Sequence, residues 1–178
     1  FPAAKRQAFL LAGLRALDDS LRARGSRLIV REGSPADALA ALMAETRAQA
    51  VYAEEGYSPF ARQRDADAAA RVTLRLCAGR TVRRPSEVVK ADGKPYTVYT
   101  PFMRAWKTLS EPTPNDLSPA PMRLPPVPDG LLSSELPDAN APADFPPGES
   151  EAQQRLLRFT RGDKEPRSAN NTHPQKNA

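Results

Sequence analysis

Apolar residues recur at helical spacing in the first part of the chain, and short apolar runs follow them. Residues 1–24 are predicted to form a helix that ends at Gly25, because leucines repeat on one face at Leu10, Leu14, Leu17 and Leu21. Residues 26–32 contain Leu28-Ile29-Val30, an apolar run typical of a strand buried on both faces of a parallel sheet. The pattern therefore starts as helix, then strand.

The same alternation continues over the next forty or so residues. Ser34-Pro35 and Ser58-Pro59 each place a capping residue before a proline that opens a helix, the second running to about Arg71. Residues 50–54 and 72–77 are predicted as strands. This order predicts an α/β fold with a Rossmann-like parallel sheet, flanking helices and right-handed crossovers. Ligands in such folds bind beyond the carboxyl ends of the strands, so the loop after Glu54 is the first candidate site.

The second half of the chain has a different composition. Residues 111–147 hold 11 of the 19 prolines, which predicts an extended linker with little core. Residues 148–162 are predicted to form one isolated helix that opens with a capping box between Ser150 and Gln153. Residues 163–178 have almost nothing apolar to bury and are predicted to be disordered.

Between these halves lies a stretch in which the periodicity changes. Residues 96–100 alternate as in a short extended segment, and Thr100 and Pro101 then suit the start of a helix. That helix would place Phe102, Met103, Trp106 and Leu109 on one face, and Trp106 is the only tryptophan in the chain. Spacing alone favours an ordinary loop-to-helix junction with an aromatic anchor.

The residue identities in two stretches carry a resemblance. Residues 93–106 read Gly-Lys-Pro-Tyr-x-Val-Tyr-Thr-Pro-Phe-x-x-x-Trp, and residues 57–65 read Tyr-x-Pro-aromatic-small-x-x-Arg-Asp. The first string resembles one near the end of the N-terminal domain of the DNA photolyase/cryptochrome family, and the second resembles the loop that lines its light-harvesting chromophore pocket. Pro-Ser-Glu-Val at 85–88 and Gly-Glu-x-x-Ala at 148–152 are also similar to segments of that family.

The resemblance implies a division into domains. Residues 1–110 would be the α/β antenna domain, 111–147 the interdomain linker, and 148–162 the first helix of a truncated FAD-binding domain. The family sheet has the order third, second, first, fourth, fifth, and the first two strands would be absent here. Leu28–Val30 and Val51–Tyr52 would then lack ladder partners, so we expect the chain alone to be unstable or to aggregate.

The resemblance also implies a site and its cofactors. The antenna chromophore would contact the loop after the second predicted strand, through Glu55, Gly56, Tyr57, Ser58, Phe60 and Ala61. Folate-binding relatives have Asn-Glu where Phe60-Ala61 stand, so a deazaflavin- or flavin-type antenna is favoured over folate. Many relatives carry acidic residues where Gly56 and Ser58 stand in this chain. The absence of these acids counts against both a deazaflavin-type and a flavin-type antenna. FAD would be bound by the C-terminal domain, and no catalytic or metal-binding residue is expected within this chain.

The function implied is that of a fragment of a deoxyribodipyrimidine photolyase, which repairs cyclobutane pyrimidine dimers in DNA with light. A cryptochrome-like blue-light photoreceptor without repair activity is the alternative, since the separating residues would lie in the FAD domain. An unrelated nucleotide-binding α/β domain is disfavoured, because the chain has no Gly-x-Gly-x-x-Gly and no P-loop. The resemblance further implies a monomer that meets dimer-containing DNA through its FAD domain.

Composition agrees with a globular protein, at 40% hydrophobic and 26% charged residues. The net charge of +5 permits nucleic-acid binding, and the densest basic cluster is Arg80, Arg83, Arg84 and Lys90, for which a solvated loop is the default. The single Cys77 excludes an internal disulfide and favours a reducing compartment, which predicts a cytoplasmic protein. We expect no membrane association, because no apolar run is long enough to cross a bilayer.

Overall fold

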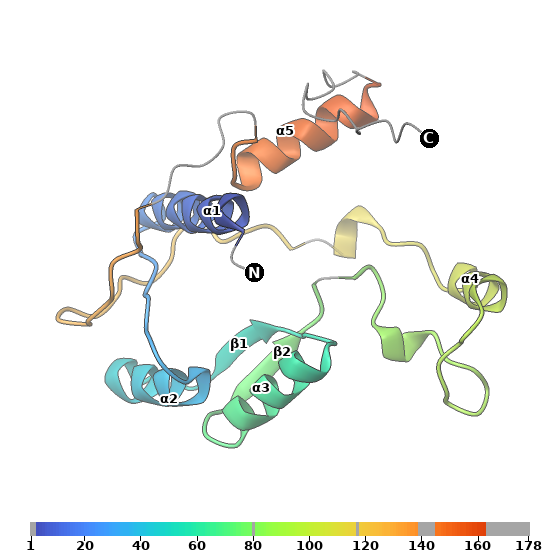
Figure 1. The fold of residues 1–178 in the computed structure, drawn as a ribbon, viewed down its shortest axis with the longest axis horizontal. Coiled ribbons are helices and arrows are strands. Elements are labelled where there is room, and N and C mark those ends of the chain that lie inside the picture. The colour runs from blue at the N-terminus through green and yellow to red at the C-terminus, as the bar shows by residue number, and fades with distance from the viewer. Residues whose placement is uncertain (1–2, 80, 117, 139–144, 163–178) are drawn as a thin grey trace, which may run out of the picture. The chain divides into compact units, whose positions relative to one another are not determined.

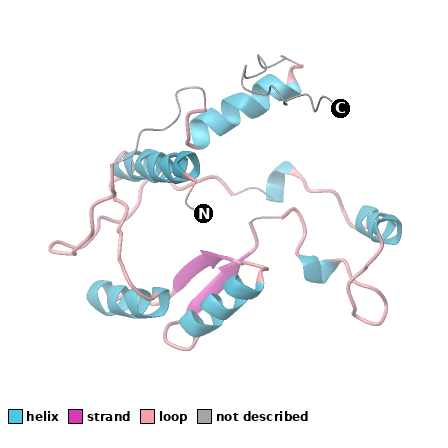
Figure 2. Cartoon of the chain, in the orientation of Figure 1, coloured by secondary structure: helices cyan, strands magenta, loops and turns pink. Residues whose placement is uncertain are grey.

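The computed structural model describes residues 3–79, 81–116, 118–138 and 145–162 (Figures 1 and 2). The chain divides into two compact units. In the described residues, unit 1 comprises 3–28, 123–126, 135–138 and 145–162, and unit 2 comprises 29–79, 81–116, 118–122 and 127–134. The predicted disordered tail at 163–178 lies outside the described residues.

Unit 2 contains the sheet. Strands β1 (Val51–Glu54) and β2 (Leu74–Cys77) pair in parallel, with Val51 opposite Leu74 and Glu54 opposite Cys77. Helix α3 (Pro59–Ala69) connects them and packs on β2, and α2 (Pro35–Thr46) packs on α3 (Figure 1). The predicted α/β class is therefore confirmed: the protein is a mixed α/β structure with a small parallel sheet flanked by helices.

Small side chains and a cap place α3 on the sheet. Ser58 Oγ accepts a hydrogen bond from the Ala61 N–H at 3.1 Å, as its place before Pro59 predicts. Ala61 and Ala68 are buried, and their methyl groups allow the helix to approach the strands closely. Ser34, in the equivalent position before α2, makes no side-chain cap, although Pro35 does open that helix.

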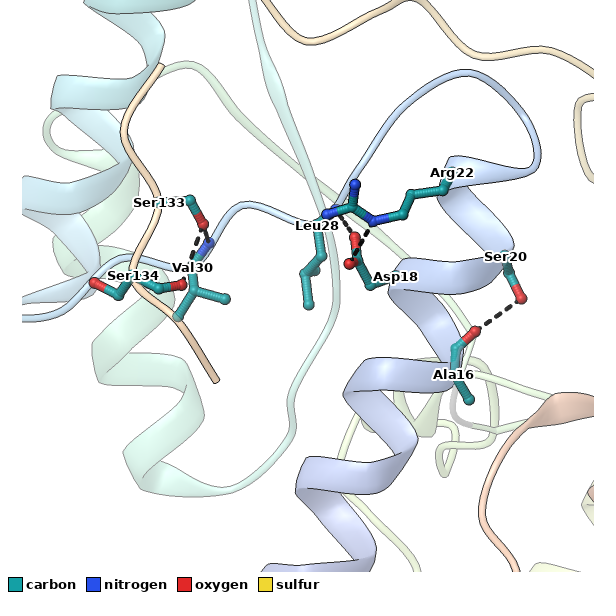
Figure 3. A network of polar contacts seen from close by, with 8 residues as sticks. All are labelled: Ala16, Asp18, Ser20, Arg22, Leu28, Val30, Ser133 and Ser134. Atoms are coloured by element: carbon teal, nitrogen blue, oxygen red, sulfur yellow. Dashed lines mark hydrogen bonds and ion pairs between the residues drawn. The ribbon is translucent and has the colours of Figure 1, made fainter. Parts of the chain in front are cut away.

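The strand predicted at residues 26–32 does not form. Val30 donates its N–H to Ser133 Oγ at 2.9 Å and accepts the Ser134 N–H at 2.9 Å (Figure 3). A buried strand needs a ladder partner on each edge, and no strand among the described residues pairs with this segment. The proline-rich linker supplies hydrogen bonds in its place, and Leu131 of the same stretch is buried.

Unit 1 contains α1 (Ala4–Arg22) and α5 (Glu149–Thr160). Helix α1 ends as predicted, with Gly25 at a φ of 91°. Helix α5 begins one residue before the predicted cap, so the Ser150–Gln153 capping box is wrong. Gln153 Nε2 instead donates to Glu149 Oε1 at 3.1 Å, an i,i+4 bond on the helix surface.

One carboxylate secures the chain where it leaves α1. Asp18 accepts the Leu28 N–H at 2.7 Å and the Arg22 Nε–H at 2.8 Å (Figure 3). The Leu28 amide, and after it the Arg22 guanidinium, lower the pKa of Asp18 below its ordinary value. The end of α1 is therefore stabilised by an ionised aspartate.

The helix around Trp106 begins earlier than predicted and ends before Leu109, which was predicted to lie on its apolar face. Helix α4 (Tyr99–Lys107) begins inside the segment expected to be extended, and Val98 rather than Thr100 is its N-cap. Pro101 does not prevent the earlier start, because first-turn amides have no partner within a helix. Two 3-10 turns complete the described elements, η1 (Pro85–Glu87) and η2 (Pro114–Asp116).

Candidate functional site

The candidate loop lies at the carboxyl ends of both strands. Glu55 follows β1 directly and donates its N–H to the Cys77 carbonyl at 2.9 Å, so it continues the ladder by one bond. The chain then turns at Gly56 and enters α3 at Pro59. This is the edge at which open parallel sheets bind ligands, as the sequence predicts.

Three of the six predicted site residues form the turn itself. Gly56 is buried, and a Cβ on it would lie 2.4 Å from the Ala61 Cβ. Ser58 uses its hydroxyl to cap α3. Gly56 and Ala61 thus let the loop fold back on the first turn of the helix, while Ser58 remains exposed at its start.

The other three residues present groups that a ligand could meet. Phe60 is 79% exposed and offers a bare aromatic face. The Tyr57 hydroxyl donates to Glu55 Oε2 over 3.4 Å, a long hydrogen bond. That same carboxylate oxygen lies 3.3 Å from Arg84 Nε. The loop can therefore offer one ring for stacking and one carboxylate–phenol pair.

Sequence reasoning left one pair of charged residues out of the site. Arg64 contacts Asp65 Oδ1 through Nε at 2.8 Å and Nη2 at 2.6 Å. Asp65 is only 7% exposed, and its Oδ2 has no hydrogen-bond partner. The sequence signal that could have identified this pair is the Arg-Asp dipeptide at the end of the string at residues 57–65. Its role in the structure is to hold a buried carboxylate under the loop.

A hollow of about 310 Å³ opens beside this pair. Glu55, Gly56, Arg62 and Asp65 line it from the loop and α3, and Leu74 and Leu76 line it from β2. The structure thus brings Glu55 and Gly56 to the hollow, whereas Tyr57, Ser58, Phe60 and Ala61 lie outside its lining. A hollow of this size suits part of a ring system rather than a whole dinucleotide.

The basic cluster is only partly solvated. Arg84 pairs with Glu55, and Arg83 contacts the carbonyl and the hydroxyl of Ser110. Arg80 lies outside the described residues. Two of the four cations therefore hold unit 2 together.

A loop between a parallel strand and its crossover helix, beside a hollow at the carboxyl edge of the sheet, is the arrangement of an open parallel α/β domain. The DNA photolyase family model matches residues 1–122, well over half of the chain. The chain belongs to the DNA photolyase family.

Individual relatives agree with this assignment. A deoxyribodipyrimidine photo-lyase of Synechococcus is 32% identical over 178 aligned residues, covering 86% of this chain and 35% of the relative. An uncharacterised 31.6 kDa Synechococcus protein is 34% identical, covering 89% of this chain and 59% of the relative. The crystal structure of a class III photolyase from Agrobacterium tumefaciens superposes with a TM-score of 0.55 at 26% identity, covering 86% of this chain and 29% of that one.

The chain spans 59% of the length of one of these curated relatives and 35% of the other. In the residues that the structure describes, no helix has both the length and the apolar character that crossing a bilayer requires.

Proposed function

We propose that this chain supplies the antenna part of a deoxyribodipyrimidine photolyase, which repairs cyclobutane pyrimidine dimers in DNA with light. The observation that carries the proposal is the family match over residues 1–122, together with the loop at the carboxyl edge of the sheet. Relatives named deoxyribodipyrimidine photo-lyase support the lyase chemistry.

Within that protein, residues 1–110 would hold the antenna chromophore and dock the FAD-binding domain, with 111–147 as linker and 148–162 as the first helix of that domain. FAD supplies the electron that splits the dimer, and residues outside this chain would bind it. The residues of this chain act by positioning a second chromophore. The protein would work as a cytoplasmic monomer that binds lesion-bearing DNA through its FAD domain.

The geometry narrows the role of each loop residue. Phe60 would stack on the chromophore ring, and the hydrogen-bonded pair of Glu55 and Tyr57 would meet its polar edge, since these side chains do not form the turn itself. Gly56, Ser58 and Ala61 would shape the loop without touching the ligand strongly. An exposed aromatic face suits a flavin or deazaflavin ring, which we favour over folate.

The test uses the longer protein that contains this chain. Expressed and illuminated with blue light, it should return a dimer-containing oligonucleotide to intact pyrimidines, and it should not do so in the dark. Heat-released pigments should include FAD and a second flavin-like chromophore.

The cryptochrome alternative predicts a different outcome from the same preparation. A protein that binds FAD and responds to blue light, yet leaves the dimers unrepaired under saturating light, would establish the photoreceptor and overturn the lyase.

A further inference from the structure

A second hollow in unit 2 is lined by other residues than the first, and the Arg84–Glu55 ion pair connects the two. The second hollow measures about 470 Å³, within the usual range for small-molecule sites. Val82, Val88, Tyr96, Phe102 and Trp106 provide apolar walls, and Arg84 is among the polar residues that line it. We refer to it below as the Trp106 hollow.

Its walls are fixed by contacts around them. Val88 is 6% exposed and forms a buried part of the lining. The Tyr96 and Phe102 rings meet edge to face, with centroids 6.4 Å apart. A bridge between Val89 and Pro95 positions Tyr96, and Arg83 secures the segment to Ser110 after α4. The hollow is therefore formed before any ligand arrives.

The lining of the hollow includes a partly exposed aromatic ring and an arginine. Trp106 is 37% exposed, although large apolar side chains gain free energy from burial. Arg84 Nε is itself buried without a hydrogen-bond acceptor, and Glu55 Oε2, at 3.3 Å, pairs with it only by proximity of charge. The arginine thus has hydrogen-bonding capacity that the protein leaves unused.

We propose that the Trp106 hollow binds a planar aromatic ring that carries a phosphate or carboxylate group. The ring would pack against Trp106 and Phe102, and the anionic group would take the place of Glu55 beside Arg84. Arginine favours such groups because its planar fork matches their oxygens. This proposal does not depend on DNA repair, and it shares only the Arg84–Glu55 pair with the antenna role proposed for the loop.

The sole tryptophan makes the test direct. Trp106 emission of the 178-residue chain is titrated with FMN and with riboflavin, which share one ring and differ by the phosphate. AMP and adenosine repeat the comparison with a smaller ring. We expect saturable quenching by a phosphate-bearing probe, at least about tenfold tighter than by its uncharged counterpart.

Two variants give changes of opposite sign. Arg84→Gln should weaken binding of the phosphate-bearing probe about tenfold. Glu55→Gln should tighten it roughly two- to fivefold, since it removes the carboxylate that competes for Arg84. Both variants should change the affinity for the uncharged probe less than they change the affinity for the phosphate-bearing probe.

A further pair of variants separates this hollow from the candidate loop. Phe102→Ala should abolish the quenching of Trp106 emission by FMN, whereas Met122→Ala, at a side chain that is 92% exposed and lines neither hollow, should leave the quenching unchanged. If Phe60→Ala abolishes the quenching while Phe102→Ala leaves it intact, the flavin binds on the loop, which would overturn this proposal while supporting the antenna site. Three other results would also overturn the proposal. They are equal affinity for FMN and riboflavin, no quenching by any probe, and Trp106 emission like that of the urea-unfolded chain.

Discussion

Gly56 shows how a single residue determines what the loop can carry. A Cβ at position 56 would stand 2.4 Å from the Ala61 Cβ, so any side chain there would push the loop away from the first turn of α3. In this chain the Ala61 methyl group occupies that space. The glycine at position 56 therefore has a packing role in this loop.

The first prediction concerns that contact. Gly56→Asp should cost about 1–3 kcal/mol of local stability through overpacking. Hydrogen exchange of the Glu55 amide, which bonds to Cys77, should accelerate accordingly. The double variant with Ala61→Gly should recover most of the protection.

Gly79→Ala is the matched control for Gly56→Asp, because its Cβ would meet only Glu54 Cγ at an ordinary 3.5 Å. Equal loss of protection in the control and in Gly56→Asp would refute the packing argument.

The second prediction concerns Asp18. Its folded-state pKa is lowered by the Leu28 amide and then by Arg22, so its contribution is complete above the ordinary value of 3.8. The contribution is lost as the pH falls below 3.8 through the lowered value. Asp18→Asn should cost about 1 kcal/mol at pH 7.

Exchange of the Leu28 amide at several pH values, corrected for intrinsic rates, checks the Asp18 prediction. The wild type and Asp18→Asn should differ at pH 7 and converge at the acidic end. A difference that persists unchanged through the acid range would contradict the assigned cause.

At the scale of elements, the sequence predicted those whose signals are local. Ser58-Pro59 and Pro35 predicted the starts of α3 and α2, and the runs at 50–54 and 72–77 predicted the two strands that pair at 51–54 and 74–77. The Leu28–Val30 run predicted a strand that is not formed, because a strand depends on partners that no local pattern reports. Ser133 and Val30 are 103 residues apart in the sequence. The hydrophobic pattern along the chain therefore could not predict their contact.

That long-range contact gives the third prediction. Ser133→Ala removes the acceptor of the Val30 N–H and should cost about 1 kcal/mol of local stability. The Val30 amide should then exchange faster, while the β1 amides keep their protection. Ser110→Ala is a suitable comparison, since it alters an exposed hydroxyl elsewhere in unit 2.

Only part of the candidate site could be predicted from the sequence. Its position followed from topology, and its residues followed from the resemblance, yet Asp65 and Leu74 were missed. Tertiary contact brings them beside Glu55, and only the Arg-Asp dipeptide hinted at one of them. Ser58 and Ala61 stay predicted ligand contacts, and the structure adds that Ser58 caps α3 and that Ala61 packs under Gly56.

At the scale of the whole molecule, the buried core is small. Among the described residues, the buried apolar positions are Ala36, Ala61, Ala68, Val88 and Leu131, and none of the large side chains is fully buried. Little apolar area thus opposes the conformational entropy of the chain. We therefore expect a two-stranded sheet with few large core residues to unfold with low cooperativity.

The fourth prediction follows from this core. Calorimetry of the 178-residue chain alone should show a broad transition of low enthalpy, or aggregation on warming. A sharp, reversible transition with the enthalpy normal for 178 residues would contradict it.

The central claim is that the loop after β1 positions a light-gathering ring in a DNA repair lyase. The most direct measurement is the action spectrum of dimer repair by the full-length protein proposed above, for the wild type and Phe60→Ala. Loss of ring stacking, worth about 1–3 kcal/mol, should empty most of the antenna site. We expect Phe60→Ala to lose the repair driven by light in the antenna band and to keep a slower repair driven by light in the FAD band. Identical spectra for the two proteins would contradict it.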